Sequence, residues 1–161
     1  MPVDAPLNGV EVAGKRAALP TCGEGRTMAE HRAQCPCGQL SVSCNGDPLR
    51  ISVCHCLACK RNTGSAFSFG ATFREQDVRV EGEERTWVRV GDEGSHITKH
   101  FCPNCGTAVY GTNDHLPGLV RAAAGCFANL DFPGPPVVSV YHESRKHPWL
   151  ELRCEPLELN G

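Results

Sequence analysis

Short stretches in which apolar and polar residues alternate, separated by turn signals, follow one another along the chain from about residue 35. The alternation is clearest in DVRVEG (77–82) and TWVRVG (86–91), which are separated by a charged Glu/Gly turn. A period of two predicts strands that bury one face. The same criterion predicts further strands at 40–44, 51–54, 66–73, 96–101, 107–112 and 137–144. We therefore expect a mainly β protein.

Helical signals are few. Only LACKRNTG (57–64) suits a helical turn, which Gly64 would end. The stretch LVRAAAGCF (119–127) fits either a strand or a short helix, and the breaker run FPGPP (132–136) separates it from the last predicted strand. The patterned region contains no repeats and no linker, so we expect a single domain with short helical turns.

The ends of the chain differ from its centre. Residues 1–33 are rich in Gly, Pro, Ala and charged residues and have no convincing periodicity, which predicts a disordered extension. Residues 34–156 are expected to form the folded domain and 157–161 a short tail. The start of the chain lacks the apolar core of a secretory signal, and no apolar run approaches the roughly 20 residues of a membrane span. We expect a cytoplasmic protein without membrane contact.

The net charge of the chain bears on the kind of partner that it could bind. The chain has 16 Lys and Arg residues against 18 Asp and Glu residues, a formal net charge of -2. No excess of positive charge is available to neutralise a phosphate backbone, so a nucleic-acid partner is not expected. The sequence leaves the oligomeric state open.

The cysteine content is the strongest chemical signal. The chain has 11 cysteines, an odd number, and most of them stand in tight clusters. Neighbouring cysteines are poorly placed to cross-link distant segments, and in a reducing compartment such clusters more often bind metal. Redox chemistry through a CxxC motif is a weaker hypothesis, because such motifs usually open a helix after a strand. Metal binding is therefore predicted.

Three clusters contain seven thiols. The first is QCPCGQL, the second CHCLAC and the third HFCPNCGTA. CPNCG is a strong knuckle motif, because its two sulfurs can face one ion while the following glycine relieves the backbone. A knuckle needs a second pair of ligands. Pairing the first and third clusters predicts one closed zinc site, formed by Cys35, Cys37, Cys102 and Cys105.

The remaining triplet is Cys54, Cys56 and Cys59. Three protein ligands with an open fourth position are typical of a catalytic zinc site. Other partitions of the seven thiols remain open. The alternative is that a protein group completes the triplet, and the candidates for it are His55, Cys44, His100 and Cys126. The other histidines, at positions 31, 96, 115, 142 and 147, have no ligand spacing and are expected to lie on the surface or in the core, whereas Cys126 and Cys154 are expected to be core residues.

The order and separation of CxCG, of CHCxxC followed by a basic pair and Gly-Ser, and of FCxxCG resemble the glutathione-dependent formaldehyde-activating enzyme family. That family includes the centromere protein V domain, and the resemblance covers about residues 35–152. It implies a β-tent of antiparallel sheets that holds two zinc ions per chain. One zinc would be structural, bound by the four paired cysteines. The other would be bound by Cys54, Cys56 and Cys59 and approached by the thiol of glutathione.

The resemblance also implies an activity. The family's reaction joins formaldehyde and glutathione into S-hydroxymethylglutathione, a carbon–sulfur lyase reaction in reverse. A zinc ion held by three thiolates is electron-rich, so it favours a nucleophilic sulfur over activated water. Lys60, Arg61 and Ser65 follow the triplet and are candidates to bind the thiol substrate, Lys99 could supply positive charge, and His55 could transfer the proton. The alternative function is a non-catalytic zinc-binding module for protein interaction.

Overall fold

The structure is a computed structural model of the chain, and it describes residues 29–129, 131–133 and 139–152. The predicted disordered extension, apart from its last residues, lies outside the described residues, as do the C-terminal tail, Cys22 and Cys154. Within the described ranges the predicted mainly β fold is confirmed: ten strands accompany one α-helix and three short 3-10 turns. No helix of these ranges is long and apolar enough to cross a membrane.

The smaller sheet has three antiparallel strands in the order β1-β2-β5. Its strands are β1 (Glu30–Gln34), β2 (Ser41–Asn45) and β5 (Val78–Glu81). The strand β1 begins before the boundary expected at residue 34, so residues 30–33 belong to the folded domain rather than to the extension. Only Ala33 of that stretch is fully buried, and one buried position produces no visible alternation.

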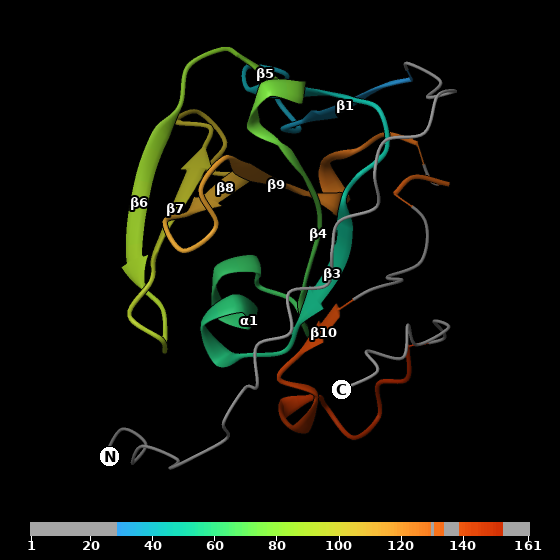
Figure 1. The fold of residues 1–161 in the computed structure, drawn as a ribbon, viewed down its shortest axis with the longest axis vertical. Coiled ribbons are helices and arrows are strands. Elements are labelled where there is room, and N and C mark those ends of the chain that lie inside the picture. Colours follow the sequence, from blue (N-terminus) through green and yellow to red (C-terminus); the bar gives the residue numbers. More distant parts are fainter. Residues whose placement is uncertain (1–28, 130, 134–138, 153–161) are drawn as a thin grey trace.

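The larger sheet has seven strands in the order β10-β3-β4-β9-β8-β7-β6. Its pairs are antiparallel except β10 with β3, which is parallel. Figure 1 shows the sheet curving so that β3 and β6 lie on opposite sides of the view, with the helix α1 between them. The strands are β3 (Arg50–Cys54), β4 (Ser68–Arg74), β6 (Arg85–Val90), β7 (His96–Phe101), β8 (Ala108–Asn113), β9 (Leu119–Ala123) and β10 (Ser139–Tyr141).

Two of the helical elements, α1 and η2, stand where the sequence allowed them. The helix α1 (Leu57–Thr63) begins after Cys56 and ends at Gly64, whose left-handed φ of 62° lets its N–H donate to the Lys60 carbonyl. The ambiguous stretch 119–127 contains both predicted alternatives, because β9 is followed directly by the 3-10 turn η2 (Ala124–Cys126). Two further 3-10 turns, η1 (Glu75–Asp77) and η3 (Glu143–Arg145), were not predicted. The strand expected at 137–144 is wrong at its end, because β10 stops at Tyr141 and η3 follows.

The two faces of the larger sheet differ in polarity. Along β4, Ala71 and Phe73 are fully buried in the hydrophobic core, together with Leu40 and Val42 from the small-sheet side. Because successive side chains of a strand point to opposite faces, the neighbours of Ala71 and Phe73 turn the other way. That second face carries hydroxyl, thiol and guanidinium groups. It is the face on which a polar site can form.

Candidate metal centres and the adjoining cavity

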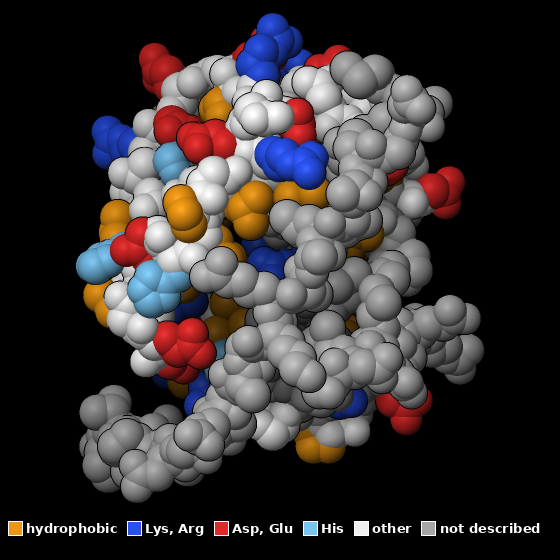
Figure 2. Space-filling model, in the orientation of Figure 1, with side chains coloured by type: hydrophobic (Ala, Val, Ile, Leu, Met, Phe, Trp, Pro, Cys, Tyr) orange, Lys and Arg blue, Asp and Glu red, His pale blue; other side chains and the backbone are white. Residues whose placement is uncertain are grey.

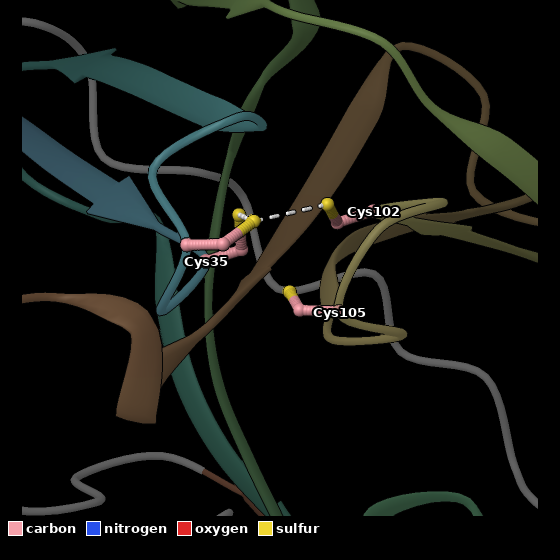
Figure 3. A group of neighbouring side chains, drawn as sticks. Cys35, Cys102 and Cys105 are labelled. Atoms are coloured by element: carbon pink, nitrogen blue, oxygen red, sulfur yellow. Dashed lines mark hydrogen bonds between the residues drawn. The ribbon is translucent and has the colours of Figure 1, made fainter.

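Four sulfur atoms from two separate turns face one another between the sheets (Figure 3). Cys35 and Cys37 lie in the turn between β1 and β2, and Cys102 and Cys105 in the turn between β7 and β8. All four sulfurs lie within 4.8 Å of one another, and Cys37 Sγ is 3.5 Å from both Cys35 Sγ and Cys102 Sγ. A disulfide would need about 2.0 Å. A tetrahedron with zinc–sulfur bonds of about 2.3 Å has edges of about 3.8 Å, so this group fits a tetrahedral metal.

The backbone of both turns directs these sulfurs. Gly38 and Gly106 follow the cysteine pairs and have left-handed φ angles of 81° and 74°. The Gly38 N–H donates to the Cys35 carbonyl at 3.0 Å, and the Gly106 N–H donates to the Cys102 carbonyl at 2.9 Å. The Leu40 N–H donates to Cys35 Sγ at 3.3 Å, which favours the thiolate form of a ligand. The local motif therefore builds half of the site in each turn.

The second group of thiols gathers at the start of α1. Cys54 ends β3, Cys56 is the N-cap residue of α1, and Cys59 lies in its first turn. Cys56 Sγ accepts the Cys59 N–H at 3.3 Å, in the way a serine or aspartate N-cap would. The thiols of Cys54 and Cys59 share a hydrogen bond. A short local segment thus brings the three sulfurs of the predicted triplet together.

Electrostatics favours a thiolate in this group. The hydrogen bond from Cys54, aided by the Ser68 hydroxyl, Cys56 and the positive charge of Lys99, holds the pKa of the Cys59 thiol well below its usual range. The same hydrogen bond, together with burial, raises the pKa of Cys54. Burial beside Arg121 lowers the pKa of Lys99. Thiolates are soft ligands suited to zinc, so the chemistry of these donors fits that metal.

One histidine that the sequence analysis did not connect with the triplet lies beside two of its three cysteines, Cys54 and Cys56, whereas Cys59 is not part of that group. The ligand atoms of Cys54, Cys56 and His142 all lie within 4.8 Å of one another, a group able to hold a metal ion. The parallel pairing of β10 with β3 sets Tyr141 beside Cys54, so His142 follows directly at the end of the pair. No spacing in the sequence could reveal this neighbour, because Cys54 and Tyr141, the last residues of the two paired strands, are 87 positions apart.

The fourth-ligand candidates suggested by the sequence lie elsewhere. Cys44 is fully buried in the hydrophobic core, and burial raises its pKa to about 12. Cys126 Sγ points to the Ala108 carbonyl, 3.9 Å away. His100 Nδ1 is 2.8 Å from Glu84 Oε1. His55 is fully buried, with its ring edge-on to that of Phe67, and it does not line the cavity described next.

A cavity of about 410 Å³ opens beside the second group and is lined by Cys54, Cys56 and Cys59. Figure 2 shows lysine and arginine side chains set in a hollow of the molecular surface. The cavity's basic lining residues are Arg50, Arg89, Lys99 and Arg121, whereas its acidic ones are Asp92 and Glu93.

A row of residues across the larger sheet forms the floor of this cavity. Strand register pairs Lys99 with Gly111, Gly111 with Arg121, Arg121 with Thr72, and Thr72 with Arg50. Paired residues share a face, so their side chains lie on the same side of the sheet. Arg121 also donates from Nε to Ser52 Oγ at 3.2 Å and from Nη2 to the Ser52 carbonyl at 3.0 Å. The row concentrates positive charge close to the thiols.

Two glycines make room for the cations of the row. A Cβ atom at Gly111 would lie 2.9 Å from the Thr98 carbonyl oxygen and 3.3 Å from Lys99 Cδ. One at Gly70 would lie 2.6 Å from Arg121 Cζ and 2.8 Å from the Ala122 carbonyl oxygen. These distances are shorter than ordinary contacts, so the Lys99 and Arg121 side chains lie over positions that only glycine leaves open.

The substrate-binding residues predicted by proximity lie outside the cavity lining. Lys60 Nζ donates to the Arg145 carbonyl at 2.6 Å, and Arg61 and Ser65 are exposed. Of the basic residues predicted near the clusters, Lys99 alone lines the cavity. The sequence analysis missed Arg121, because its partner strands are distant in sequence and their register was unknown.

The fold and its thiol groups define a mainly β protein with one four-cysteine group able to hold a metal ion and a second Cys/His group beside a basic cavity. A sequence model of the family described as glutathione-dependent formaldehyde-activating enzyme matches residues 30–144. The chain belongs to this family, and the predicted resemblance is confirmed. The crystal structure of a Rhodobacter sphaeroides protein is also similar, with 21% identity and a TM-score of 0.49, covering 62% of this chain and 90% of that chain.

Proposed function

We propose that the protein joins glutathione, or a closely similar thiol, to formaldehyde or another small aldehyde, and that it catalyses the reverse carbon–sulfur lyase reaction. The observation that carries the proposal is that Cys54, Cys56 and Cys59 line the same cavity as Lys99 and Arg121. Family membership supports it, since the family's description names both glutathione and formaldehyde. A substrate that carries both a thiol and carboxylates matches such a cavity. The cysteines offer a soft site for the thiol, and Lys99 and Arg121 offer positive charge for the carboxylates.

Two zinc ions fit the donor groups of the chain. Cys35, Cys37, Cys102 and Cys105 would hold a structural ion, since four thiolates close a tetrahedral site. Cys54, Cys56 and Cys59 would hold the second. A zinc ion at that second position supplies a place at which a substrate thiol binds as thiolate, because metal coordination removes the proton of a thiol.

The residues of the cavity would orient the substrate. Lys99 and Arg121 can pair with carboxylates, and guanidinium groups bind carboxylates through two parallel hydrogen bonds. Thr72 lies between the two arginines of the row, and its buried hydroxyl has no hydrogen-bond partner among the described residues. A ligand oxygen would supply that partner. The floor of the cavity therefore favours an anionic ligand over a neutral thiol.

The bond changes are simple. The substrate sulfur attacks the aldehyde carbon, so a carbon–sulfur bond forms while the carbonyl π electrons move to oxygen. That oxygen takes up a proton, which replaces the one lost by the thiol, and the product is a hemithioacetal, which for formaldehyde is the hydroxymethyl thioether. In the reverse direction the hydroxyl loses its proton, the carbonyl forms again and the thiolate leaves. The chain's contribution is to hold the sulfur and the carboxylates in place.

A non-catalytic role in protein interaction is the second candidate. It is favoured by β6, the edge strand of the larger sheet, where Trp87 is 51% exposed, Val88 51% and Val90 62%. Exposed apolar residues on an edge strand are typical of a contact surface. In that role the second thiol group would stabilise the fold and would have no thiol substrate.

The proposed reaction is tested by mixing glutathione and formaldehyde with the zinc-loaded protein and following the adduct by NMR against the uncatalysed rate. We expect an acceleration proportional to protein concentration, and a smaller one with 2-mercaptoethanol, which has a thiol but no carboxylate. No acceleration by protein that contains two zinc ions per chain would contradict the proposal and favour the interaction module.

Replacing Lys99 by glutamine is expected to raise the KM for glutathione by about tenfold or more, because a charge-assisted hydrogen bond is worth roughly 1.5–3 kcal/mol. Initial rates at varied glutathione concentration measure the effect. Arg61→Gln is the comparison, since Arg61 is exposed and lies outside the cavity lining, and it should leave the KM unchanged. Equal effects of both substitutions would show that the row does not bind the substrate.

A further inference from the structure

His142 lies at the one place around the second thiol group where the described chain offers another ligand. Its ring nitrogen and the sulfurs of Cys54 and Cys56 lie within 4.8 Å of one another. Cys59 is outside that group, but its thiol is hydrogen-bonded to Cys54 and Cys56, so the four residues could form a set of three cysteines and one histidine. Such a set is a common closed zinc site. The group could therefore be complete without a substrate, which conflicts with a site that must accept a thiol. This conflict is resolved if the imidazole of His142 leaves the metal when the substrate thiol binds.

The support of His142 is weaker than that of the cysteines. Cys54 and Cys56 stand at the junction of β3 with α1, and β3 pairs along its whole length with β4. His142 instead follows β10, a strand of three residues at the edge of the sheet. Short edge elements are among the parts of a protein that open most easily. The histidine can move while the sulfurs stay in place.

The backbone at His142 is held in an unfavourable conformation. Its φ of 56° lies in the left-handed region, and it is the only such non-glycine residue in the described part of the chain. Strained backbone of this kind persists where surrounding contacts enforce it, and it occurs often at ligand-binding sites. The imidazole is also exposed, so an incoming molecule can reach it.

Contacts of Arg145 hold the turn that follows His142. The Arg145 carbonyl accepts a hydrogen bond from Lys60 Nζ at 2.6 Å, and Arg145 Nη1 lies 3.8 Å from Asp92 Oδ2. The Arg145 N–H donates to the His142 carbonyl at 2.9 Å. Lys60 belongs to α1, and Asp92 belongs to the segment that follows β6. Through Arg145, the turn after His142 is therefore connected to both of these elements. These contacts are exposed and exchange readily with water.

We propose that His142 is the resident fourth ligand of the second metal site and that the thiol of the substrate replaces it. The inference rests on the proposed function, because it assumes a zinc ion held by Cys54, Cys56 and Cys59. In the exchange the imidazole nitrogen would give up its place on the metal to the sulfur of the substrate, and the thiol proton would pass to solvent. His142 then keeps the site closed until a thiol arrives.

The test uses Co²⁺ in place of zinc, because its visible absorption bands report the sulfur, nitrogen and oxygen ligands of a tetrahedral site. We expect His142→Ala to shift the bands of the substrate-free protein, since water replaces nitrogen. Glutathione should bring the wild-type and His142→Ala spectra to the same end point, because neither then has an imidazole ligand. The variant should also bind glutathione more tightly, by about tenfold if the imidazole occupies the site nine-tenths of the time.

His115→Ala is the matched control, because His115 is exposed and lines the same cavity but belongs to neither thiol group. It should leave the bands unchanged. Identical spectra for wild type and His142→Ala would overturn the proposal, and so would different end points with glutathione, which would show that the imidazole stays bound. Failure of the proposed reaction is a separate result: shifted bands without accelerated adduct formation would keep the ligand role and reject the enzyme.

Discussion

Replacing Cys102 by serine is expected to remove most of the protein's stability. Cys102 is fully buried, and its group joins the turn between β1 and β2 of the small sheet to the turn between β7 and β8 of the large one. Binding of a structural zinc contributes about 10 kcal/mol or more in small domains, against a typical total stability of about 5–15 kcal/mol. Thermal unfolding and the zinc content per chain measure the loss, and zinc should fall from two ions to one or fewer.

Cys44→Ser is the matched control for Cys102→Ser. Cys44 is equally buried, but it lies in the hydrophobic core and in neither metal group. Burying its hydroxyl should cost about 1–3 kcal/mol and leave the zinc content unchanged. If Cys102→Ser melts no lower than Cys44→Ser and keeps both ions, the four-cysteine group does not stabilise the fold through a metal.

Replacing Cys59 by serine is expected to abolish the acceleration of adduct formation while the fold survives. Cys59 is only half-buried and lies in the first turn of α1, outside the hydrophobic core. Changes to the outer partners of a metal ligand already cost 10–100-fold, so losing the ligand itself should cost at least about 100-fold. The rate with glutathione and formaldehyde, the zinc content and the melting temperature are the three measurements.

The stability of the Cys59→Ser variant distinguishes the proposed enzyme from the non-catalytic interaction module. For an enzyme, Cys59→Ser should lose the second zinc and melt only a few degrees lower, since about 1 kcal/mol corresponds to roughly 2–4 °C in a chain of this size. A loss of stability as large as that of Cys102→Ser would show that the second group also supports the fold. That outcome would favour the non-catalytic interaction module.

Most strands could be predicted because their signal is local. Alternation in DVRVEG and TWVRVG indicates β5 and β6, and LACKRNTG with Gly64 indicates α1. The strand β1 was missed over residues 30–33, because Ala33 alone is fully buried there. The stretch 119–127 stayed ambiguous because it changes from strand to 3-10 turn within a few residues. Local patterns describe elements, but they do not say which strands become neighbours.

The functional site also divides into features that local sequence patterns predict and features that depend on strand pairing. Spacing within CPCG, CHCLAC and CPNCG depends on turn geometry over a few residues, so the three clusters could be recognised as metal-binding candidates. Proximity along the chain then suggested Lys60, Arg61 and Ser65 as substrate contacts, and the cavity is lined elsewhere. His142 and Arg121 could not be found in this way. Each reaches the site through strand pairing with residues about 50 to 90 positions away.

The sequence by itself determined the mainly β character and the three thiol clusters, because each depends on residues only a few positions apart. It also indicated the family, because the order and separation of those clusters can be read along the chain. Only the tertiary structure decided what surrounds the triplet. The register of four strands, β7, β8, β9 and β4, sets Lys99, Gly111, Arg121 and Thr72 in one row, and the parallel pairing of β10 with β3 brings His142 to Cys54. A shift of one residue would turn these side chains to the opposite face, so long-range register defines the cavity.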